Sequence, residues 1–233
     1  LAQTRAESGR NLVRGVKYLA EDVQRMLKGL GPVGVENYQV GEQIAASKGK
    51  VILRNSLMEL IQYSPTTPKV YAEPVLIVPA WIMKYYILDL SPKNSLVNYL
   101  TDMGHTVFMI SWKNPTAEDR DIAMDDYLSL GVLAALDAIG TVVPKRKIHG
   151  VGYCIGGTLL AIAAATLAQK EDERLGTVTM FAAQTDFSEP GELSVVSSPA
   201  QLAMLEAMMW KKGVLESQQM GGAFQLLRTY DLL

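Results

Sequence analysis

The sequence has little cysteine, little histidine and little net charge: one Cys, two His and a formal charge of −2 across 233 residues. A single cysteine excludes an internal disulfide and fits a reducing compartment such as the cytoplasm. The near-zero charge gives no general attraction to nucleic acid. No apolar run reaches the ~20 residues that a membrane-spanning helix needs, so we expect no transmembrane segment.

The N-terminus also lacks features that a targeting signal would have. Residue 1 is leucine, and residues 1–10 are polar, so we expect no secretory signal. The missing initiator methionine suggests that the chain begins partway through a longer protein.

The most informative stretch is residues 152–157, which read Gly-Tyr-Cys-Ile-Gly-Gly. The run before it, 147–151, is typical of a short buried strand, and the apolar run after it, 158–168, is typical of a buried helix. A strand, a glycine-flanked nucleophile and a helix in this order form a nucleophile elbow, here with Cys in place of Ser.

The geometry of the elbow explains the spacing of the glycines around Cys154. Cys154 must lie on a tight, strained turn, and small neighbours at Gly152, Gly156 and Gly157 give that turn room. The helix N-terminus stabilises a thiolate, and the backbone N–H of Ile155 can serve as an oxyanion donor. A lone Cys among apolar residues is more often an inert core thiol. Its place at the nucleophile position favours catalysis.

An amphipathic helix is predicted at residues 8–30. Its apolar side chains recur at spacings of three and four, at Leu12, Val16, Leu19, Val23, Met26 and Leu30. The helix either packs on the body of its own protein or docks on a partner or an amphiphilic surface. Glycines and a proline at 29–34 mark a linker.

From residue 50 onward, strands alternate with helices, which predicts a mostly parallel α/β sheet with helices on both faces. A hairpin (51–53 and 57–63) leads into it. We predict strands at 75–78, 106–111, 147–151 and 177–182, and helices at 94–103, 125–140 and 158–168. The helix at 125–140 is expected to face inward with Tyr127, Leu130, Leu133, Ala134 and Leu136.

Three regions follow from this pattern. We expect a helical N-terminal segment at 1–46, an α/β core at 47–187, and the start of a cap or lid at 188–233 with a Met-rich helix at 201–210.

Several motifs together resemble the polyhydroxyalkanoate synthases, also called poly-3-hydroxybutyrate polymerases, and their class I-like members in particular. These motifs are Val-Gly-Glu-Gln-Ile-Ala (40–45), Lys-Tyr-Tyr-Ile-Leu-Asp-Leu (84–90), Gly-His-Thr-Val-Phe-Met-Ile-Ser-Trp-Lys-Asn-Pro (104–115) and the elbow itself. The resemblance implies an α/β-hydrolase-like fold. It also implies that the core at 47–187 is incomplete and lacks its C-terminal strands.

The resemblance also implies an activity. The family polymerises (R)-3-hydroxyacyl-CoA into polyester granules in the cytoplasm, and Cys154 matches the nucleophile that holds the growing chain as a thioester. Coenzyme A would then be part of the substrate and a product, and no cofactor or metal is expected. The growing polyester, the granule surface and a second copy in a homodimer are the implied partners.

The general-base His and its Asp in this family lie well beyond the elbow helix. The two histidines here, His105 and His149, precede Cys154, and we interpret both as structural. Asp186 is a weak candidate acid and more naturally caps a turn. The triad Asp and His are therefore expected beyond residue 233.

Residues 80–83, Ala-Trp-Ile-Met, depart from the Pro-Cys-Ile-Asn of many family members. A backbone N–H of Ile82 or Met83 can still supply the second oxyanion donor. Trp81 and Tyr85 either line an acyl pocket or fill the core.

Two other interpretations stand beside this one. A Cys-dependent hydrolase of the dienelactone hydrolase type shares the elbow but needs a His after its nucleophile, and 155–233 contains none. A non-catalytic interaction protein would use the N-terminal and Met-rich helices as binding surfaces, and its cysteine would be buried and inert.

Overall fold

The structure is a computed structural model that describes residues 2–31, 33–189, 191 and 198–215. The chain forms two compact units, Leu1–Ala46 and Ser47–Leu233. The further division of the second unit into a core and a cap stays a prediction, because most of 188–233 lies outside the described residues. No helix in the described part combines the length and apolar character that crossing a membrane requires.

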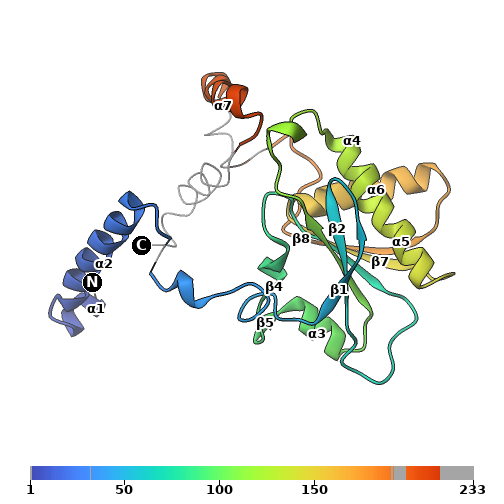
Figure 1. Cartoon of the computed structure of the whole chain (residues 1–233), viewed down its shortest axis with the longest axis horizontal. Coiled ribbons are helices and arrows are strands. Elements are labelled where there is room, and N and C mark those ends of the chain that lie inside the picture. Colours follow the sequence, from blue (N-terminus) through green and yellow to red (C-terminus); the bar gives the residue numbers. More distant parts are fainter. Residues whose placement is uncertain (1, 32, 190, 192–197, 216–233) are drawn as a thin grey trace. The chain divides into compact units, whose positions relative to one another are not determined.

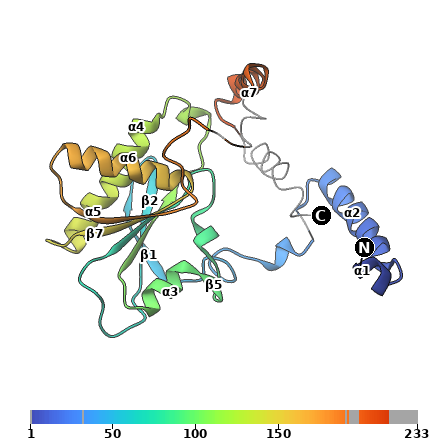
Figure 2. The same cartoon turned by 180° about the vertical axis from the view of Figure 1, so that it is seen from behind.

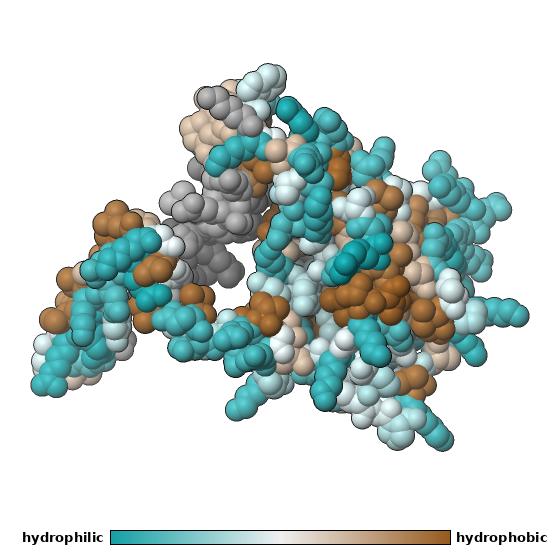
Figure 3. Space-filling model, viewed as in Figure 1, coloured by the Kyte–Doolittle hydropathy of each residue, from teal (hydrophilic) through white to brown (hydrophobic). Residues whose placement is uncertain are grey.

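The first unit contains α1 (Ala2–Ala6), α2 (Arg10–Leu27) and the short 3₁₀ turn η1 (Val35–Asn37). The predicted helix is confirmed, with glycines at its ends because Gly9 and Gly29 adopt positive φ angles of 80° and 69°. No residue of α2 is buried. Its apolar side chains remain on the surface, where Figure 3 shows brown atoms along the helix.

The second unit is built on one sheet with the strand order β1-β2-β6-β3-β7-β8 in the described part of the chain (Figure 1). The antiparallel β1, β2 and β6 are followed by the parallel β6, β3, β7 and β8. All predicted strands are confirmed to within two residues. Their bounds are β1 Gly49–Arg54, β2 Met58–Tyr63, β3 Val75–Val78, β6 Val107–Trp112, β7 Ile148–Tyr153 and β8 Leu175–Phe181.

Helices cover both faces of this sheet (Figures 1 and 2). On one face, α3 (Leu96–Asp102) covers a cluster that includes Val75 and Ile77. On the other, α5 (Ala134–Val142) and α6 (Ile155–Gln169) cover a larger cluster that includes Leu76 and Val78. Successive β3 residues thus point to opposite layers, and each buried side chain contributes about 1.5–3 kcal/mol.

Short elements complete the unit. A hairpin, β4 (Asp89–Ser91) and β5 (Asn94–Ser95), precedes α3, so the helix predicted from residue 94 begins two residues later. Ser95 caps it by accepting the N–H of Asn98 at 3.0 Å. The Met-rich helix is confirmed as α7 (Pro199–Lys212). Two further 3₁₀ turns are η2 (Tyr85–Leu88) and η3 (Ala117–Asp119).

One predicted helix has a different inward face. It runs as α4 (Met124–Asp126), a π-helical segment η4 (Tyr127–Leu133) and α5. Leu136 is buried as predicted, but Leu130 is 37% exposed, while Gly131 and Val132 are buried instead. The prediction for Leu130 was wrong because the wider i→i+5 turn rotates the residues relative to an α-helical periodicity.

Strand β8 forms an edge of the described sheet. It pairs with β7, and most of its residues are exposed, Val178, Met180 and Phe181 by more than a third. An apolar strand with an unpaired backbone edge is a template for pairing with other chains.

Two glycines on the π–α5 helix allow a matched stability test. A methyl at Gly131 would lie 2.4 Å from a ring carbon of Trp112, whereas a methyl at Gly140 would meet nothing within 4 Å. We expect Gly131→Ala to destabilise the fold by about 1–3 kcal/mol through overpacking. Gly140→Ala should be neutral or stabilising by up to about 1 kcal/mol. Urea denaturation measures both, and equal stabilities would contradict this packing.

Candidate active site

The centre of the site is Cys154, which lies between the end of β7 and the start of α6. Its backbone has φ 55° and ψ −131°, a conformation that costs a non-glycine residue of order 1–3 kcal/mol. Its N–H donates to the carbonyl of Phe181, the last residue of β8, at 2.9 Å. Cys154 is half-buried, and its thiol is free of any disulfide. This is the strained turn that the sequence predicts for a nucleophile elbow.

Close backbone packing explains the glycines around the elbow. A Cβ at Gly152 would lie 2.3 Å from the Cα of Gly157, and one at Gly156 would lie 2.3 Å from the carbonyl oxygen of Val78. A Cβ at Gly157 would lie 2.5 Å from that of Ala183. The first turn of α6 therefore lies directly against β7, the end of β3 and the chain after β8.

Two backbone N–H groups near the elbow have no acceptor among the described residues. The first belongs to Ile155, the first residue of α6, and the second to Ile82 in the loop after β3. The N–H of Met83 instead donates to the carbonyl of Ala80 at 3.1 Å, which closes a turn. Of the two loop residues that the sequence proposes, Ile82 is thus the better oxyanion donor.

Both histidines lie near the start of their strands, at the end of the sheet opposite to Cys154. His149 is the second residue of β7, and its Nδ1 lies 2.9 Å from the hydroxyl of Thr177. His105 lies just before β6, and its ring stacks 5.0 Å from that of Tyr71. Because β6 and β7 both run parallel to β3, their first residues lie far from the turn that follows β7. This placement agrees with a structural role for both.

Asp186 acts as a turn cap. Its carboxylate accepts the N–H of Ser188 at 2.9 Å. Hydrogen bonds from the backbone and the side chain of Ser188 hold the pKa of the Asp186 carboxyl below its usual value. A carboxylate that is already ionised at neutral pH is a poor general acid.

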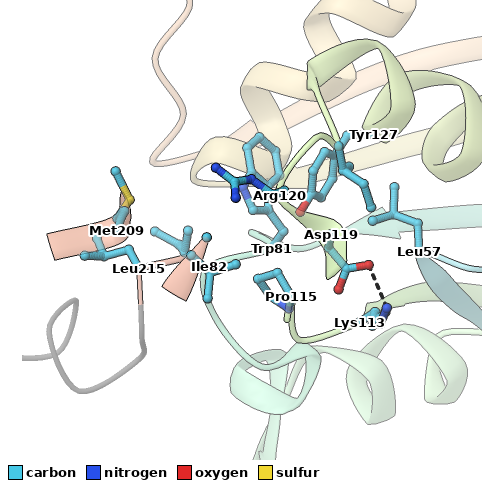
Figure 4. A pocket seen from close by; sticks show the side chains of 13 residues that line it. Leu57, Trp81, Ile82, Lys113, Pro115, Asp119, Arg120, Tyr127, Met209 and Leu215 are labelled. Carbon is cyan, nitrogen blue, oxygen red and sulfur yellow. Dashed lines mark hydrogen bonds and ion pairs between the residues drawn. The ribbon is translucent and has the colours of Figure 1, made fainter. Parts of the chain in front are cut away.

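A cavity of about 410 Å³ lies beside the loop after β3 (Figure 4). Trp81 lines it and stacks on Tyr127 at 4.7 Å. The Ile82 side chain also lines it, while Cys154 does not. Its walls are mostly apolar and come from separate segments: Leu57, Trp81, Ile82, Lys113, Pro115, Asp119, Arg120, Ile122, Tyr127, Met209, Gly213, Val214 and Leu215.

Tyr85 does not line this cavity. It packs with the core cluster around Tyr63, on the face covered by α3, and burial raises the pKa of its phenol. Of the two aromatic residues proposed for an acyl pocket, Trp81 lines this cavity and Tyr85 does not.

The polar rim of the cavity was not predicted. Lys113 forms a 2.7 Å ion pair with Asp119, and that hydrogen bond, with the N–H of Thr116, holds the pKa of the Asp119 carboxyl below its usual value. Arg120 lies at the same rim, with no hydrogen-bonding partner among the described residues. Of these residues, only Lys113 falls in a motif that the sequence singled out.

The fold and the site together define a class of protein. A cysteine elbow follows β7, an interior strand of a mostly parallel sheet that helices cover on both sides. Residues 73–215 match the profile of the alpha/beta hydrolase fold, and the chain belongs to this family.

Within that family, the sequence resembles one group of polymerases. Residues 1–100 match the profile described as the Poly-beta-hydroxybutyrate polymerase (PhaC) N-terminus. The poly(3-hydroxyalkanoate) polymerase of Methylorubrum extorquens is 42% identical over all of this chain and 39% of its own length. The PhaC polymerase subunit of Cupriavidus necator is 34% identical over 97% of this chain and 39% of its own. The resemblance inferred from the motifs is confirmed.

The chain spans about two fifths of the length of these relatives. Among solved structures, a chain from a study of fungal esterases of Rhizomucor miehei is similar with a TM-score of 0.45 and 17% identity, over 67% of this chain and 48% of the other.

Proposed function

We propose that this chain is the nucleophile-bearing part of an acyltransferase that polymerises (R)-3-hydroxyacyl-CoA, 3-hydroxybutyryl-CoA in particular, with release of coenzyme A. The observation that carries the proposal is Cys154 at a strained elbow, beside two N–H groups that have no acceptor in the described part of the chain. The similarity to poly(3-hydroxyalkanoate) polymerases supports the substrate class.

The proposed acylation is a thioester exchange. The Cys154 thiolate attacks the carbonyl carbon of the acyl-CoA thioester, and the N–H groups of Ile155 and Ile82 donate to the resulting oxyanion. The bond to sulfur of coenzyme A then breaks, the coenzyme leaves as a thiolate, and the acyl group stays on Cys154. Because one thioester replaces another, the step is nearly balanced in free energy.

Chain growth needs a base as well. The 3-hydroxyl of one acyl unit attacks the thioester carbonyl of another, so that an ester bond forms, the carbon–sulfur bond breaks and the sulfur leaves as a thiolate. The proton of the hydroxyl must be removed in this step. Neither described histidine lies near Cys154, so we propose that the base comes from another part of the full-length protein. No separate cofactor is needed for either step.

The cavity beside Trp81 is the proposed site for the acyl part of the substrate. It adjoins Ile82, whose N–H is a proposed oxyanion donor, and its apolar lining suits a hydrocarbon chain. The full-length enzyme is proposed to act in the cytoplasm at the surface of polymer granules, as a homodimer.

Replacing the nucleophile tests this mechanism. In the full-length protein, Cys154→Ala should abolish polymer formation and thioester labelling, a rate loss on the order of 10⁴-fold or more. Cys154→Ser should keep the geometry and lose most activity, because an alkoxide is harder to generate than a thiolate. Coenzyme A release and polymer yield are measured. Polymerisation that survives Cys154→Ala contradicts the proposal.

The exposed stripe of α2 is proposed to mediate self-association or granule attachment. Leu19 and Val23 are 64% and 43% exposed. The double substitution Leu19→Asp with Val23→Asp should shift the full-length protein toward monomer or toward the soluble fraction. Lys17→Gln with Gln24→Asp makes the same change in net charge on the other face and serves as the control. Equal distributions for both variants, in sedimentation and granule fractionation, would exclude this role.

The 233-residue chain expressed alone should be catalytically silent and prone to aggregate. Its described residues place no base near Cys154, and such a base typically contributes ~10²–10⁴-fold to the rate. The apolar strand β8 also has only β7 as a neighbouring strand in the described part of the chain. Its Cys154 should still react with iodoacetamide if the elbow folds. The measurement is coenzyme A release from 3-hydroxybutyryl-CoA, with light scattering for association. Sustained turnover by a soluble monomer would overturn this expectation.

A further inference from the structure

A buried hydrogen bond ties the loop after β3 to the end of β6. The indole N–H of Trp112, the last residue of β6, donates to the carbonyl oxygen of Pro79 at 2.7 Å. Pro79 is the first residue of the loop that carries Ile82. Trp112 is not among the residues that line the cavity beside Trp81, so its N–H has no role there.

The same carbonyl is held from its other side by the elbow. A Cβ at Gly156 would lie 2.6 Å from both the carbonyl carbon and the oxygen of Pro79. Only a glycine in the first turn of α6 lets the loop come so close. The Pro79 peptide is thus enclosed between α6 and the indole of Trp112, and the proline ring fixes its own φ.

The indole is itself held in place by the π-helical segment. Its ring contacts Tyr127 at a centroid distance of 5.3 Å and Trp81, edge to face, at 6.4 Å. A ring carbon of Trp112 lies 2.4 Å from where a Cβ of Gly131 would be, so the helix approaches the ring without a side chain between them. π-helical segments occur often at functional sites.

We propose that Trp112 is a positioning residue for the oxyanion hole, a role that rests on the proposed acyl transfer at Cys154. Its N–H fixes the Pro79 carbonyl, and this sets the course of the three residues that lead to Ile82. The N–H of Ile82 then stays aimed at the site where negative charge develops on the acyl oxygen. Such a donor must be correctly placed before the reaction, because a displacement near 1 Å can cost ~10²-fold in rate.

A purely structural role for Trp112 makes a different prediction. If the indole only fills the core, its loss should lower stability and affect every reaction of Cys154 alike. If it positions the oxyanion donor, reactions that develop an oxyanion should slow selectively. Alkylation of the sulfur by iodoacetamide develops no oxyanion, whereas acylation by p-nitrophenyl butyrate does.

The first variant replaces only the indole N–H. In the full-length protein, Trp112 is exchanged site-specifically for 3-benzothienylalanine, which keeps the bicyclic ring and puts sulfur in place of N–H. Trp112→Phe is the second variant. The matched control is the same pair of exchanges at Trp210, which is 76% exposed and does not line the cavity. Acylation bursts, alkylation rates and melting temperatures are measured for each.

We expect acylation of both Trp112 variants to slow by ~10–10²-fold, since loss of a whole oxyanion donor costs ~10²–10³-fold. Alkylation should stay within about twofold of wild type, as expected for a reaction without an oxyanion. The Trp210 variants should match wild type in both reactions. Equal loss of acylation and alkylation, unchanged acylation, or a wild type without any acylation burst would each overturn the proposal.

A separate measurement keeps the two proposals apart. If wild type is acylated by p-nitrophenyl butyrate but not by 3-hydroxybutyryl-CoA, the proposed substrate is wrong. The comparison of Trp112 variants with the ester then still decides whether the indole positions the oxyanion hole.

Discussion

The site depends on how closely the first turn of α6 approaches the sheet. Gly152 and Gly157 meet backbone to backbone, and Gly156 meets the end of β3. Any side chain at these positions would push the helix outward and carry Ile155 away from the loop after β3. The strained turn at Cys154 persists because this contact and its hydrogen bond to Phe181 hold it from both ends. The same backbone contacts therefore position both the nucleophile and the proposed oxyanion donors.

Much of this architecture could be predicted from sequence because short, local patterns of residues determine it. The short apolar runs gave the strands, and the glycine spacing gave the elbow with Cys154 at its tip. The inward face of the helix at 124–142 could not be read in the same way. Nothing in an apolar run distinguishes an α turn from a π turn, so Leu130 was assigned to the core and Gly131 was not. The π turn coincides with a tertiary contact, the close approach of Gly131 to the ring of Trp112, which no local pattern reveals.

The candidate site shows the same limit at longer range. Trp81 and Tyr85 are four residues apart, yet the 3₁₀ turn at Tyr85–Leu88 sends Tyr85 to the opposite layer of the core. The cavity wall joins residues near 57, 81, 113–127 and 209–215, which no local pattern connects. Likewise, the choice between Ile82 and Met83 depended on a turn bond from Met83 to Ala80. The local sequence predicted which side chains and N–H groups are candidates for the site. Tertiary packing determined which of them face it.

The hydrogen bond from Cys154 to Phe181 has a further consequence. It fastens the reactive residue to β8, a strand at one edge of the described sheet, where protection against local opening is low. Fraying of that strand would release one end of the elbow while the rest of the sheet stays folded. Whatever covers β8 therefore also sets how long the nucleophile keeps its shape. The same opening equilibrium of β8 would then govern how often the elbow loses its catalytic conformation.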